Sequence, residues 1–167
     1  VLSEYTWMAA AKREFGAAKI VIPRRSPILT TDAIDEHSGT FVRVDHPLLG
    51  TWLGIQEGPM TQTPDGWTLE ATQIGVLAKA MLIERSRMQE MLPAGAWARE
   101  ALAFTTGPLA PAITPGAFVM APPLVPPTSI TGRTLASVLS DLADYAGQEW
   151  EVTDQQQLNW IAPRRAL

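Results

Sequence analysis

The 167-residue sequence predicts an α+β protein with an antiparallel β-barrel-like domain, a helical and proline-rich middle and a small β-α-β-β domain. Short β-branched runs separated by turn signals come first, helix-forming residues and prolines follow, and a periodic apolar helix precedes two short apolar runs at the end. We therefore expect a β-barrel-like domain over residues 1-82, a helical segment with a proline-rich arm over residues 83-127, and the β-α-β-β domain over residues 128-167.

The first segment is predicted to hold several short antiparallel strands. Residues 17–23 combine β-branched side chains with a closing proline, and residues 40–44 alternate apolar with polar positions. Residues 51–56 and 67–71 follow turn-forming sequences, and the turn before residue 67 is Pro64-Asp65-Gly66. Strands at this spacing indicate a small barrel or sandwich.

The middle of the chain favours helix and then an extended arm. Residues 74–92 are rich in helix formers, with Pro93 as the end of the predicted helix, and residues 94–104 favour a second short helix. Seven prolines from Pro108 to Pro127 oppose regular helix and central strand. We expect an ordered arm there, because the stretch also carries apolar side chains to bury, namely Ile113, Phe118, Val119, Met120, Leu124 and Val125.

The last segment contains the clearest helical pattern of the sequence. Apolar residues at helical spacing lie between Thr134, a predicted N-cap, and Gly147, a predicted C-terminal stop; they are Leu135, Val138, Leu139, Leu142, Ala143 and Ala146. Two apolar runs then predict a hairpin packed on this helix, with Trp150 and Val152 in the first and Leu158 and Trp160 in the second. A strand at Ser129-Ile130 would complete the β-α-β-β unit.

Composition excludes several classes of function. The formal net charge of -4 and the pI near 5.1 argue against direct nucleic-acid binding. The absence of cysteine excludes disulfides, thiolate zinc sites and thiol nucleophiles. The longest apolar stretches, such as residues 75–83, are shorter than the roughly 20 residues of a membrane span. No signal-peptide pattern is visible, so we expect a soluble protein without direct membrane binding.

Candidate sites for chemistry each have a simpler structural explanation. His37 and His46 lie near acidic residues, namely Asp32, Asp35, Glu36 and Asp45, but their spacing matches no zinc motif and favours a solvated acidic loop. Asp141 and Asp144 lie one turn apart on a helix, where the polarity of the outer face explains them. No Gly-x-Ser-x-Gly motif or Gly-rich phosphate loop occurs. We therefore expect no catalytic, cofactor-binding or metal-binding residue and no enzymatic activity.

Aromatic and basic residues are the remaining candidates for contacts with partners. The six tryptophans are Trp7, Trp52, Trp67, Trp97, Trp150 and Trp160. Core packing is the default for Trp150 and Trp160 because they alternate along predicted strands, whereas Trp7 and Trp52 are better candidates for an interface. The pair Arg164-Arg165 is more typical of a solvated terminus than of a basic contact.

Two parts of the chain resemble the tail hub (tail-tip, baseplate hub) proteins of tailed bacteriophages. Residues 17–23, 39–45, 51–57 and 67–71 resemble the opening β-domain of that family. The stretch Ile130-Thr131-Gly132-Arg133-Thr134-Leu135, followed by Val138-Leu139, Leu142-Ala143, Gly147-Gln148-Glu149-Trp150 and Leu158-Asn159-Trp160, is similar to its recurring helix and hairpin. The second part is the more specific.

The resemblance implies a structural protein of the virion, made in the bacterial host cytoplasm and located at the tail tip. Hub proteins of this family form trimers whose β-domains continue the tail tube and bind a ring of distal tail subunits. The resemblance implies no chemistry and no cofactor. Hub proteins are commonly longer and return to the first β-domain, which this chain does not, so closure of a barrel within this chain is in doubt.

Two other classes stay open at this point. A periplasmic ring-building domain like those of secretins also packs a short helix on a small sheet, and a signal peptide in the parent gene would favour it. A tail-associated cell-wall hydrolase would need its catalytic residues elsewhere in the parent polypeptide.

Overall fold

The computed structural model describes residues 4–8, 16–24, 41–47, 50–84, 90–106 and 112–162. It confirms a mixed α+β protein rich in strands. The chain forms two compact units, Val1–Ile74 and Gly75–Leu167. This division differs from the three predicted segments, because the helix and the strands of residues 83–127 pair and pack within the second unit.

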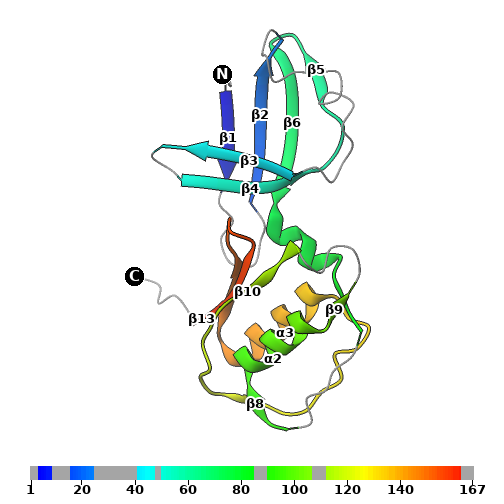
Figure 1. The fold of residues 1–167 in the computed structure, drawn as a ribbon, viewed down its shortest axis with the longest axis vertical. Helices are drawn as coiled ribbons and strands as arrows, with labels where there is room; N and C mark the ends of the chain where they lie inside the picture. Colours follow the sequence, from blue (N-terminus) through cyan, green and yellow to red (C-terminus); the bar gives the residue numbers. More distant parts are fainter. Residues whose placement is uncertain are drawn as a thin grey trace. The chain divides into compact units, whose positions relative to one another are not determined.

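Unit 1 is built on one curled antiparallel sheet. Its strands run in the order β1-β2-β6-β4-β3, and β5 also pairs with β6 (Figure 1). The strands are β1 (Glu4–Met8), β2 (Ala17–Pro23), β3 (Phe41–His46), β4 (Gly50–Gln56), β5 (Thr61–Thr63) and β6 (Gly66–Gln73). The four strands predicted in this part of the sequence are therefore present, while β1 and β5 were missed. In Figure 1 the β3–β4 pair crosses over β1, β2 and β6.

One face of the curled sheet carries the core of unit 1. Strand periodicity places alternate side chains on this face, and the buried cluster consists of Ala18, Ile20, Ile22, Val44, Trp52, Leu69 and Ala71, with Val42 and Met60 packed against it. The strand register explains which residues form this cluster. Ile20 pairs with Leu69 and Val44 pairs with Trp52, so both side chains of each pair lie on the same face of the sheet. Gly54, two residues beyond Trp52 on the same face, has no side chain and leaves room for the indole ring.

The predicted turn at Pro64-Asp65-Gly66 is confirmed. Thr63 pairs with Gly66 across two turn residues, and Gly66 has a φ of 153°, a conformation open to glycine. A side chain at this position would also meet the carbonyl oxygen of Ile22 on the neighbouring strand. The turn therefore fixes the register of the β5–β6 hairpin.

The described strands do not close into a barrel. β1 and β3 lie at the two ends of the strand order, and no pairing joins them within the described ranges. Among the described residues the hydrogen-bonded sheet of unit 1 is therefore open, and the barrel-like form predicted from the sequence stays a prediction.

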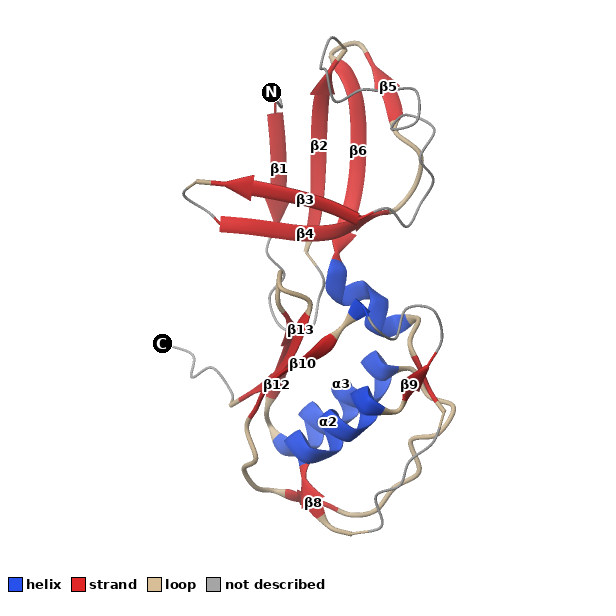
Figure 2. Cartoon of the chain, in the orientation of Figure 1, coloured by secondary structure: helices blue, strands red, loops and turns tan. Residues whose placement is uncertain are grey.

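Unit 2 places two helices beside a three-stranded sheet of order β10-β13-β12 (Figure 2). β10 is parallel to the central strand β13, and β12 is antiparallel to it. Two two-stranded pairs, β8 with β11 and β7 with β9, complete the unit. Its elements are η1 (Ile74–Lys79, a 3₁₀ helix at the junction of the units), β7 (Leu82–Ile83), β8 (Leu92–Pro93), α2 (Ala94–Ala103), β9 (Thr105–Thr106), β10 (Thr114–Phe118), β11 (Leu124–Val125), α3 (Leu135–Ala146), β12 (Glu149–Val152) and β13 (Gln157–Ile161).

The predicted final helix and hairpin are confirmed. Thr134 caps α3 by accepting a hydrogen bond from the Ser137 backbone N–H, and Gly147 ends the helix in the left-handed conformation. The apolar stripe of α3 is buried except for the half-buried Ala146. The alternate hairpin residues are also buried, namely Trp150, Val152, Leu158 and Trp160. Helical period and strand alternation in the sequence therefore correctly predict both elements.

The first strand of the C-terminal unit is not where the sequence predicted it. Ser129 and Ile130 are not in a strand, although Ile130 is buried. The strand that pairs with β13 is β10, inside the proline-rich arm. Pro115 is tolerated because β10 lies at the sheet edge, and the Asn159 side chain accepts the Ala117 N–H at 2.9 Å where the register shifts.

The helix predicted within residues 74–92 is a short 3₁₀ helix, and the described residues 80–84 and 90–92 are not helical. A 3₁₀ helix ends at Lys79, and Leu82–Ile83 form the short strand β7. Backbone groups of this segment bond to the chain before α3, since the Ile83 N–H donates to the Arg133 carbonyl and the Ile83 carbonyl accepts from Gly132. Tertiary pairing therefore outweighs local helix propensity here.

We expect Leu139→Asp to destabilise unit 2 by about 3 kcal/mol or more, because Leu139 is fully buried on α3 and an unpaired carboxylate there has no partner. Asp141→Ala, on the exposed side of the same helix, should cost less than about 1 kcal/mol, since it removes only a surface ion pair. Urea unfolding followed by tryptophan fluorescence measures both. Equal losses in the two variants would contradict the orientation of α3.

Candidate interaction surface

A pocket of about 200 Å³ opens on unit 2 between α2, α3 and the segment that links β11 to α3. Its apolar wall consists of Trp97, Val125, Pro126, Ile130, Val138 and Leu142, and its polar lining is Thr128, Arg133, Asp141 and Tyr145. It is mostly apolar with a few polar groups, which is the usual composition of a binding pocket.

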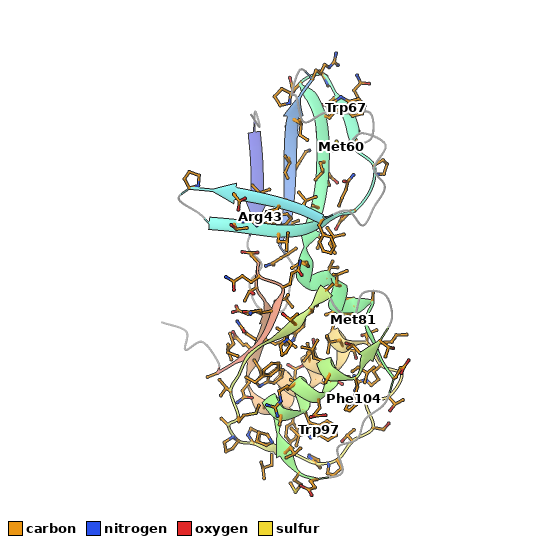
Figure 3. All side chains as sticks on the ribbon, in the orientation of Figure 1. Arg43, Met60, Trp67, Met81, Trp97 and Phe104 are labelled. Atoms are coloured by element: carbon orange, nitrogen blue, oxygen red, sulfur yellow. The ribbon has the colours of Figure 1, made fainter. Side chains whose placement is uncertain are left out.

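The apolar wall is held in place by local structure. Trp97 is buried on α2, and its indole N–H donates to the Val125 carbonyl at 3.3 Å, which ties the arm to the helix (Figure 3 labels Trp97). Val138 and Leu142 lie one turn apart on α3 and so face the same side. The pocket therefore has rigid walls on helices, and the irregular segment supplies its remaining side.

A single ion-paired arginine spans one side of the pocket. One Arg133 guanidinium nitrogen, Nη2, donates to Ser137 Oγ at 2.6 Å and to Asp141 Oδ2 at 2.5 Å. The two charges compensate each other, so this side of the pocket offers hydrogen-bonding groups without net charge. The carboxylate of Asp141 is therefore engaged in an ion pair.

The pocket is bordered by exposed apolar side chains. Leu124 on β11 is 45% exposed, and Tyr145 on α3 is 56% exposed. They lie side by side, because the Tyr145 hydroxyl donates to the Leu124 carbonyl at 3.2 Å. Large apolar side chains around a pocket are typical of surfaces that bind another protein.

The proline-rich arm supplies much of the apolar surface around the pocket. Val125 is buried, whereas Met120 and Leu124 stay exposed and Phe118 and Val119 are half-buried. β10 and β11 both belong to the arm, and the Val119 N–H donates to the Trp160 carbonyl at 2.9 Å. The arm is thus laid on unit 2 with part of its apolar surface uncovered.

Unit 1 exposes one large aromatic side chain among the described residues. Phe41 is 51% exposed and pairs across β3–β4 with the half-buried Ile55, on the face away from the core. The next residue on that face, Arg43 (labelled in Figure 3), forms an ion pair with Asp45. The outer face of this strand pair therefore combines an aromatic side chain with compensated charges.

The metal site considered in the sequence is not assembled in the described part of the chain. Asp32, Asp35, Glu36 and His37 lie outside the described residues. The Asp45 carboxylate accepts hydrogen bonds from Thr51 Oγ1 at 2.5 Å and from Arg43 Nε at 3.0 and 3.1 Å. No cluster of metal-ligating side chains occurs where side chains are described.

The structure also shows whether the paired aspartates and the candidate interface tryptophans are exposed or buried. Asp141 and Asp144 are both exposed on α3, as their helical positions predict. Trp52 is only 6% exposed, so the interface role considered for it is wrong, because the alternation of β4 places it on the inner face of the sheet. The side chain of Trp7 and the pair Arg164-Arg165 lie outside the described residues, although the backbone of Trp7 pairs with Ala18.

The pocket itself could not be found from the sequence. Its lining comes from α2, α3 and an irregular segment spread over 49 positions, from Trp97 to Tyr145, with no shared motif. The only sequence signal was the apolar content of the arm.

No helix among the described residues is long and apolar enough to cross a membrane. No family model matches the chain, and a search of the curated proteins finds no match.

Hydrogen bonding to Thr51, and then the bonds and charge of Arg43, hold the pKa of Asp45 below its ordinary value of 3.8. Because the pKa of Asp45 is lower in the folded chain than in the unfolded chain, its ionised carboxylate stabilises the fold. This stabilisation is fully present above the pKa that Asp45 has in the unfolded chain, and it is lost as the pH falls through the pKa that Asp45 has in the folded chain. We expect Thr51→Val to raise the pKa of Asp45, as measured by NMR titration of the carboxyl carbon. An unchanged pKa would show that the threonine contact does not form in solution.

We further expect zinc, calcium and ATP to leave the melting temperature of the full chain unchanged, because a ligand raises it only by binding the folded state. The described residues supply no ligand cluster, and the sequence has no phosphate loop. Differential scanning fluorimetry with each additive checks this, and a reproducible rise that EDTA reverses would identify a metal site.

Proposed function

We propose that this chain is a non-catalytic structural subunit of a phage-type tail tip, a hub that forms a trimeric ring closing or extending the tail tube. Its partners are further copies of itself, the ring of distal tail protein and other tail proteins. In this role it contributes to host cell attachment and genome delivery at the tip of the virion, and its contribution is binding energy rather than chemistry.

The observation that carries the assembly role is the uncovered apolar surface on unit 2. Met120 and Leu124 of the arm, together with Tyr145 of α3, remain exposed in a single chain. Exposing such side chains costs free energy that burial against a neighbour recovers. A subunit of a larger assembly has that neighbour.

The identity of the assembly rests on the resemblance of the strands of residues 17–71 and of the helix and hairpin of residues 130–160 to tail hub proteins. We propose that the open sheet of unit 1 is the barrel-like tube domain and that neighbouring chains complete its wall. Because β1 and β3 end the described sheet, strands from neighbours have edges at which to add.

We expect imaging of the native particle that contains this chain to show three copies around a tail axis, next to a ring of distal tail subunits, because a head-to-tail interface repeated by a closed rotation generates a ring. Cryo-electron microscopy of the particle measures this. A ring in an outer membrane, or a monomer bound to a saccharide, would overturn the proposal.

A further inference from the structure

We draw no further inference here: the strongest candidate, the pocket of unit 2 between α2, α3 and the segment that links β11 to α3, has apolar walls that are almost fully buried, and nothing in the described part of the structure shows what covers it.

Discussion

The packing of one tryptophan organises unit 2. Trp160 is fully buried on the central strand β13, where it pairs with Trp150 on β12 and is in register with Phe118 on β10. Its indole N–H donates to the buried side-chain oxygen of Gln148 at 2.6 Å. Because a buried N–H without a partner costs about 1–3 kcal/mol, this hydrogen bond removes that penalty and fixes the indole ring at one orientation in the core.

The arm and the first helix depend on that position. The Trp160 carbonyl accepts a hydrogen bond from the Val119 N–H. At the start of α2, glycine is required at position 95, because a Cβ there would collide with the Val119 carbonyl and lie close to the Trp160 ring. The arm is therefore clamped between strand and helix as far as Val119, and Trp97 binds it again at Val125. The segment between these two fixed points carries Met120 and leads to Leu124, and both remain exposed. The uncovered surface is a consequence of how the core is built.

Sequence periodicity correctly predicted the helix and strands whose buried face shows as a regular apolar pattern. It missed the strands that form only because they pair with residues far away in the sequence. The stripe of α3 and the alternation of β12 and β13 give a clear local signal, so helix, caps and hairpin agree with the structure. β10 carries a proline and a glycine and is a strand only because β13 lies beside it. β7 lies in a helix-forming sequence but bonds to residues 132 and 133, about 50 positions away. The pocket follows from these long-range contacts and has no local pattern of its own.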